Sequence, residues 1–160
     1  MKKIKLNFKK PKLKHGSGMI EILIATGVVG LVMTAVVAGF VLSVKSTTFG
    51  KNQVLASTRA QEAMEVFRRE KVLLGWAQFS DSVGDDTYCV NDLPSDSGAF
   101  QAMQTGVCAE GEVITNTVFI RQALVDVISD GEIRVEVVVN WQDGDSSQSV
   151  NLVQEFKQYE

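Results

Sequence analysis

Three places in this 160-residue chain hold residue types that could carry out chemistry. Glu21 stands directly before a long uncharged run, where a carboxylate favours a cationic partner. Cys89 and Cys108 would be joined in a disulfide if this part of the chain is exported, and would be free thiols in a reducing compartment. Asp143-Gly144-Asp145 places two acids at a spacing that suggests a calcium loop.

The calcium interpretation is weak, because no Glu follows Asp145 at the distance that a calcium loop requires. Asp143-Gly144 is instead typical of a hairpin turn. The sequence also contains no recognisable zinc-ligand set, glycine-rich phosphate loop or serine nucleophile motif. We therefore expect no metal, no cofactor and no enzymatic activity.

The uncharged run extends from Ile22 to Val44 and is long enough to cross a membrane. As a helix it would rise roughly 35 Å, against about 30 Å for a hydrocarbon core. Seven Lys and no acid precede Gly16, whereas the rest of the chain carries nine basic and nineteen acidic residues. The seven Lys before the run also outnumber the two just after it, Lys45 and Lys51, which predicts a single membrane span with its N-terminus in the cytoplasm.

The segment Lys14-His15-Gly16-Ser17-Gly18-Met19-Ile20-Glu21-Ile22 resembles the class III signal of type IV prepilins and pseudopilins. The resemblance implies that a prepilin peptidase cuts after Gly16. Ser17 would then be the first mature residue and the site of N-methylation, and Glu21 the fifth, with a role in assembly. Because the only histidine, His15, lies in the leader, cleavage would leave no Cys–His pair for catalysis.

A second helix is predicted over roughly 51–74, a stretch without Pro or Gly. One stripe is apolar and the other face is charged; Arg68-Arg69-Glu70-Lys71 is interpreted as solvated and not as a nucleic-acid site. The apolar stripe comprises Ala56, Ala60, Ala63 or Met64, Phe67 and Leu74. The pattern Ala56, Ala60, Gln61, Glu62, Met64, Glu65 and Arg68 is similar to minor pilins of the PilV type and to pseudopilin I of type II secretion.

The remaining sequence predicts a head with a turn-rich part, roughly 76–113, that contains both cysteines. Three strands follow, at about 117–128, 132–141 and 149–156, and the middle one alternates cleanly between Ile133 and Trp141. The expected fold is α+β, a long helix packed on a small antiparallel meander. The expected parts are a leader (1–16), an apolar helix (17–44), a stalk helix (45–75) and an extracytoplasmic head (76–160).

The function that these features favour is structural: a minor pilin of a type IV pilus or a related filament. The resemblance implies that its partners are other pilin subunits, the prepilin peptidase, the inner-membrane assembly machinery and, before assembly, membrane lipid. Nucleic acid is not expected. Two alternatives stay open, a type II secretion pseudopilin and a single-pass membrane-anchored binding or sensor domain.

Overall fold

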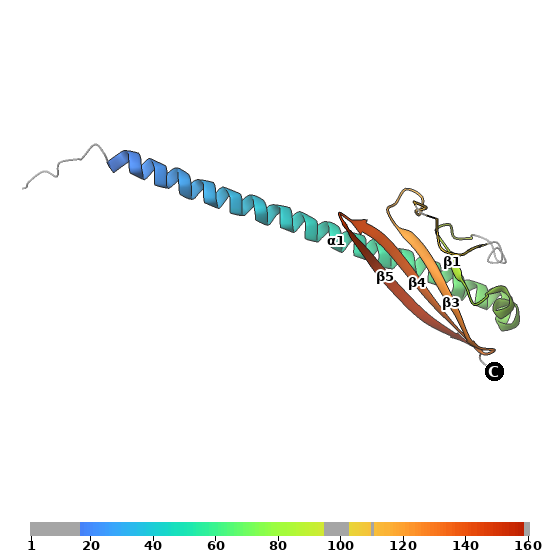
Figure 1. Ribbon diagram of the computed structural model, residues 1–160. Helices are drawn as coiled ribbons and strands as arrows, with labels where there is room; N and C mark the ends of the chain where they lie inside the picture. The colour runs from blue at the N-terminus through green and yellow to red at the C-terminus, as the bar shows by residue number, and fades with distance from the viewer. Residues whose placement is uncertain (1–16, 95–102, 110, 159–160) are drawn as a thin grey trace, which may run out of the picture. The chain divides into compact units, whose positions relative to one another are not determined.

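The structure is a computed structural model that describes residues 17–94, 103–109 and 111–158 (Figure 1). The chain divides into two compact units, Met1–Ser46 and Thr47–Glu160. A single long helix, α1 (Ser17–Ser82), contributes to both, and all strands belong to the second unit. The α+β class predicted from the sequence, one long N-terminal helix packed on an antiparallel sheet, is confirmed.

Helix α1 continues beyond the point where the stalk helix was expected to end. The helical backbone breaks at Gly75, whose φ of 73° is readily adopted by glycine, and then resumes as far as Ser82. The helix resumes because the residues after the break have apolar partners. Phe79 is fully buried, with its ring 5.7 Å from that of Phe156, and the Trp76 indole N–H donates to the carbonyl of Asp130 at 2.9 Å.

The sheet has five antiparallel strands in the order β2-β1-β3-β4-β5. The meander of β3 (Ile120–Ser129), β4 (Glu132–Asp143) and β5 (Ser146–Lys157) was predicted, with limits a few residues shorter or shifted. Two short strands, β1 (Thr87–Cys89) and β2 (Gln104–Thr105), were not predicted. They extend the sheet beyond β3.

The two turns of the meander lie where Asp-Gly pairs occur in the sequence. Asp130-Gly131 separates β3 from β4, and Gly144-Asp145 forms a two-residue loop between the paired residues Asp143 and Ser146. Gly144 has a φ of 62°, as the first central position of a type II′ hairpin turn requires. Asp143-Gly144-Asp145 is therefore a hairpin turn, as interpreted.

The core of the second unit lies between α1 and one face of the sheet. From β4 every second side chain is buried, and from α1 the predicted apolar stripe is buried apart from Leu74, which is half-buried. These residues are Ile133, Val135, Val137, Val139 and Trp141 on β4, and Ala56, Ala60, Ala63, Met64 and Phe67 on α1. The small alanines allow the helix to approach the sheet closely, and the larger side chains fill the space between.

The prediction of a solvated face at Arg68-Arg69-Glu70-Lys71 is wrong for one residue. The side chain of Glu70 is 0% exposed, whereas that of Arg68 projects into solvent. Glu70 follows Phe67 by three residues and therefore continues the buried stripe of α1. The Arg69 guanidinium lies 3.2 Å from the Glu70 carboxylate, which provides the charge compensation that a buried acid requires.

Candidate functional site

The predicted processing and assembly residues lie at the start of α1. Gly16 falls outside the described residues, and Ser17 is the first residue of the helix. Glu21 is exposed one helical turn later, with Ile20, Ile24 and Ala25 around it. Positions 17 and 21 therefore share one face of α1, the arrangement that the assembly hypothesis requires.

After Glu21, the first unit of the chain exposes apolar side chains on every face of α1. Leu23 is 70% exposed, Leu31 73% and Phe40 70%, and the most apolar window of the helix contains no buried residue. By length and composition this is the one candidate membrane span within the residues that the structure describes. An apolar surface of this extent is typical of a segment that contacts lipid or another protein.

Two hydroxyl groups within this apolar stretch are satisfied by the helix itself. The Thr26 hydroxyl donates to the carbonyl of Ile22 at 2.9 Å, and that of Thr34 donates to the carbonyl of Leu31, also at 2.9 Å. Such bonds remove the cost of placing a hydroxyl group in hydrocarbon, where water is absent. These polar side chains are therefore compatible with a membrane.

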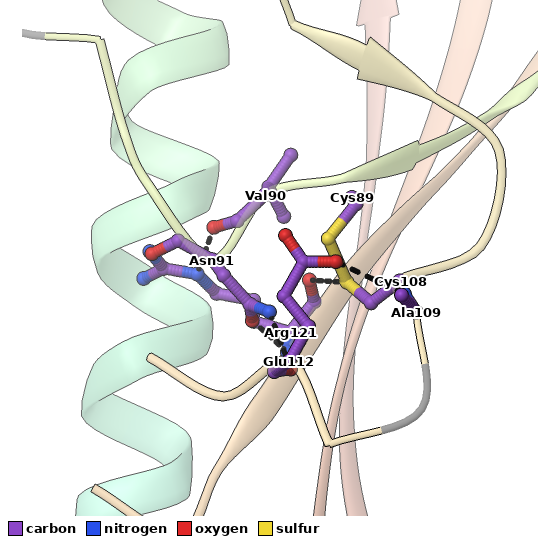
Figure 2. The surroundings of a disulfide bond; sticks show 7 residues. All are labelled: Cys89, Val90, Asn91, Cys108, Ala109, Glu112 and Arg121. Carbon is purple, nitrogen blue, oxygen red and sulfur yellow. Dashed lines mark hydrogen bonds between the residues drawn. A yellow bond between two sulfur atoms is a disulfide. The ribbon is translucent and has the colours of Figure 1, made fainter. Parts of the chain in front are cut away.

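In the head, Cys89 and Cys108 form a disulfide, with their Cα atoms 4.8 Å apart (Figure 2). Cys89 is the last residue of β1, and Cys108 follows β2. The Glu112 carboxylate lies beside the bond and accepts a hydrogen bond from the amide of Ala109 at 3.0 Å. These two sulfurs and the carboxylate lie within 4.8 Å of one another, but sulfurs joined in a disulfide are not the thiolates that bind a metal.

A buried arginine, which the sequence analysis did not single out, connects the disulfide region to α1. Arg121 lies on β3 and is only 2% exposed. Its guanidinium donates to the carbonyls of Val90 at 2.7 Å, Asn91 at 3.0 Å and Arg59 at 2.8 Å. In Figure 2, Arg121 and Asn91 lie between the disulfide and α1. One side chain thus joins the helix, strand β3 and the chain after β1.

Asn91 completes this network and is itself buried. Its side-chain oxygen accepts from the backbone amide of Arg121 at 2.8 Å, and its amide nitrogen donates to the carbonyl of Glu112 at 2.7 Å. The Sγ atom of Cys108 lies 3.4 Å from the carbonyl oxygen of Arg121. The disulfide, Asn91 and Arg121 therefore form one cluster, which we name the Arg121 cluster.

The charge of Arg121 is balanced from α1. Burial lowers the pKa of Arg121 to about 10, and the Glu62 carboxylate, 3.5 Å from the guanidinium, opposes this shift. The side chain remains cationic at neutral pH, and its hydrogen bonds are therefore charge-assisted. Glu62 also forms an ion pair with Arg59 at 2.8 Å, so a single acid on α1 compensates the charge of two arginines.

The sequence contains a signal for Arg121, although a faint one. Arg121 lies two residues before Ala123 and four before Val125, so all three side chains are on the same face of β3. Ala123 and Val125 are buried, and they pair with Val137 and Val135 of β4. A strict alternation along β3 would therefore have placed the arginine on the core face. The bonding partners could not be inferred in this way, because they come from α1 and from the irregular chain after β1.

Neither the family models nor the curated proteins and solved structures compared with this chain give a match. The fold and the candidate site nevertheless define a class of protein. It is an α+β protein whose N-terminal helix supplies a candidate membrane span in its first part and, in its second part, one layer of a disulfide-bonded head. This layout is consistent with a pilin-like fold.

Proposed function

We propose that this protein is a filament subunit of the type IV pilin kind, a minor pilin made as a precursor and cleaved after Gly16. The observation that carries the proposal is the position of Glu21. It is the single acid on an otherwise apolar and exposed helical surface, and it lies at a fixed offset from a glycine that ends a basic segment.

Cleavage would give Glu21 a partner. The new α-amino group at Ser17 would be a cation four residues before the carboxylate, which is one helical turn. Within one chain, the helix N-terminus favours a carboxylate by up to about 1 kcal/mol. Between chains, the carboxylate of an incoming subunit can meet the amine of one already assembled, and pairing avoids the larger cost of an isolated charge in hydrocarbon.

The apolar surface supports the same proposal. In the membrane it contacts lipid, and in a filament it would contact the equivalent surface of neighbouring subunits. Both environments are apolar, so the transfer from one to the other costs little hydrophobic free energy. The charge pair then supplies the axial register that apolar contacts alone do not specify.

Cleavage is tested by co-expression with a prepilin peptidase. Intact-mass measurement should show a chain that begins at Ser17, and Gly16→Leu should block the cut. Gly27→Leu is the matched control, because its position in α1 has open space for a side chain and lies away from the cleavage site. An uncleaved wild-type chain, or a cut beyond Val44, would support a plain anchor or an ordinary secretory signal and would contradict the pilin proposal.

Assembly is tested with Glu21→Gln. We expect membrane insertion and leader removal to be retained, while the fraction of cleaved subunit in sheared filaments decreases. Glu65→Gln is the control, because it removes an exposed acid from the part of α1 that belongs to the second unit instead. Equal incorporation of Glu21→Gln and wild type would show that the carboxylate has no part in assembly. Incorporation into a type II secretion pseudopilus in place of a pilus would select the corresponding alternative.

A further inference from the structure

The sheet ends in a long strand with an open edge. In the part of the chain that the structure describes, β5 (Ser146–Lys157) pairs only with β4, along all twelve of its residues (Figure 1). Its other side presents backbone N–H and C=O groups without a strand partner. The opposite edge of the sheet, β2, has only two residues. An edge of this length is a template for pairing with another strand unless it is protected.

The protective features of edge strands are sparse here. β5 contains no proline, and its only lysine is its last residue, Lys157. Its residues from Ser146 to Glu155 are all exposed or half-buried. No other described strand covers this edge, and the hydrogen bonds from the side chains of Arg68 and Lys71 reach β5 in its C-terminal part, at Gln154 and Lys157.

A groove lies beside this edge, between α1 and β5. It has a volume of about 250 Å³ and is lined by Gln61, Met64, Glu65 and Arg68 of α1 and Leu152 of β5. Met64 and Leu152 supply an apolar floor, while Glu65 and Arg68 are ion-paired to each other at 3.1 Å. A strand added to β5 would direct every second side chain to the face of the sheet on which α1 and this groove lie.

We infer that the occupant is β5 of a second copy, paired antiparallel about a two-fold axis at the middle of the strand. Residues opposite each other in such a pair must point to the same face, so their numbers have the same parity. Two registers then give the greatest overlap. One places Leu152 opposite Leu152 of the other copy, and the other places Asn151 opposite Asn151.

The charges of β5 fit this pairing. Glu155 and Lys157, its only charged residues, lie at its C-terminal end, and its first half is rich in serine. In an antiparallel pair each charged end therefore faces the other copy's polar end, and no like charges oppose each other. In the Asn151 register, Lys157 faces the exposed Asp145 of the turn before β5. Charge thus favours a second copy running antiparallel.

This inference is independent of the proposed filament function, because it depends only on the head. A two-fold contact closes on itself and joins two heads, whereas a filament grows by contacts that do not close. Because α1 runs alongside β5 in the same direction, the pairing places the two copies of this helix antiparallel, so it would join heads that approach from opposite directions.

The test uses three variants of the full-length protein in dilute detergent micelles, each of which adds one free cysteine to the chain and keeps the Cys89–Cys108 disulfide: Leu152→Cys, Asn151→Cys and Gln148→Cys. Residues facing each other across an antiparallel pair have Cα atoms about 4.5–5.5 Å apart, which a disulfide can bridge. We expect mild oxidation to cross-link position 152 or position 151, but not both. The reactive position should give at least about ten-fold more covalent dimer than position 148, because pairing raises its effective concentration.

Gln148 is the matched control because it lies on the same strand, faces the groove side as Leu152 does and is half-buried. In either register its two copies would be at least about 20 Å apart. Similar cross-linking at all three positions would indicate random collision within micelles and overturn the inference, as would cross-linking at none.

A non-covalent measurement provides the second check. Leu152→Lys places two lysines at or near the two-fold axis, and we expect it to reduce the dimer fraction in sedimentation several-fold. Ser149→Lys adds the same charge to the outer face of the strand away from the axis and should have the smaller effect. Unchanged thermal unfolding of both variants would show that the heads remain folded. An unchanged dimer fraction in Leu152→Lys would contradict the pairing.

Discussion

The first and second parts of α1 both carry apolar side chains, but in opposite surroundings. Up to Ser46 the large apolar side chains are exposed, whereas beyond Thr47 one stripe of them is buried against the sheet. The charged residues explain the difference. The second part carries a charged face that defines an inside and an outside, and the first part, after Glu21, carries none until Lys45. A helix that is apolar all round requires an apolar environment from outside its own chain.

The largest expected effect comes from truncating the same side chain in each part. Phe67→Ala should destabilise the head by about 3–5 kcal/mol, because it removes a fully buried ring and leaves a cavity. Phe40→Ala should leave the unfolding of the head unchanged, since Phe40 is exposed in the first unit. Near-UV circular dichroism of the detergent-solubilised protein during heating measures both. A lower midpoint for Phe40→Ala would show that the two parts are energetically coupled.

Removal of the disulfide should have the next largest effect. The bond closes a loop from Cys89 to Cys108, and constraint of a loop of this size contributes roughly 3 kcal/mol in the chain-entropy model. We expect the double variant Cys89→Ser/Cys108→Ser to unfold at a lower denaturant concentration, with the membrane insertion of the first unit unaffected. An unchanged midpoint would mean that the hydrogen bonds of Arg121 and Asn91 hold this region without the disulfide.

A smaller loss is expected from Arg121→Met. The carbonyls of Val90, Asn91 and Arg59 would lose their donor, at a cost of about 2 kcal/mol. Arg134→Met is the control, because Arg134 pairs with exposed acids on the outer face of the sheet, where ion pairs contribute little. If both variants unfold at the same denaturant concentration, the buried cluster has no special role.

The smallest effect concerns pH. The hydrogen bond from Arg134 lowers the pKa of Glu155, and the hydrogen bond to Glu132 raises the pKa of Lys157. Ionised Glu155 therefore stabilises the head fully at pH values above its ordinary pKa of 4.5. This stabilisation is lost as the pH falls through the lower pKa that the group has in the folded protein. Protonated Lys157 stabilises the head fully at pH values below its ordinary pKa of 10.5. This stabilisation is lost as the pH rises through the higher pKa that the group has in the folded protein.

Since both side chains are exposed to solvent, we expect only a slight fall of the melting temperature at each extreme, and less at high salt. Glu155→Gln should remove the acid-side part alone. A melting temperature that depends as steeply on pH in Glu155→Gln as in wild type would assign the titration to other groups.

The elements predicted correctly are those in which one periodic pattern continues over many residues. β4 alternates from Ile133 to Trp141, and the alanine stripe of α1 repeats at helical spacing, so local sequence and tertiary burial agree. β1 has only three residues, and its place in the sheet depends on pairing with β3 some thirty residues later and on the disulfide. No local pattern encodes such pairing.

The predictions for some single residues were wrong or missing for a similar reason. Glu70 and Arg121 are charged and were assigned to solvent or passed over, although each is in phase with buried neighbours. The stalk helix was predicted to end near Leu74, and the backbone does break at Gly75, but burial of Phe79 restores the helix for seven more residues. Of the candidate site, the place of Glu21 at the start of the apolar helix can be inferred from the sequence, whereas the network around Arg121 depends on three segments that are distant in the chain.

The contacts of α1 with the sheet also have a mechanical consequence. Arg59 is bonded to Arg121, Arg68 to Gln154 and Lys71 to Lys157, so the helix is attached at successive positions along its length. A pull along the helix axis loads these bonds and the apolar contacts in parallel, and they must shear together, whereas a pull across the axis peels them one at a time. In force spectroscopy the protein is held at one fixed point while the pulling handle is attached either at residue 47 or at residue 82. We expect a lower rupture force in the placement that peels the helix than in the one that shears it. Resistance to tension would then depend on the direction of loading more than on the free energy of unfolding.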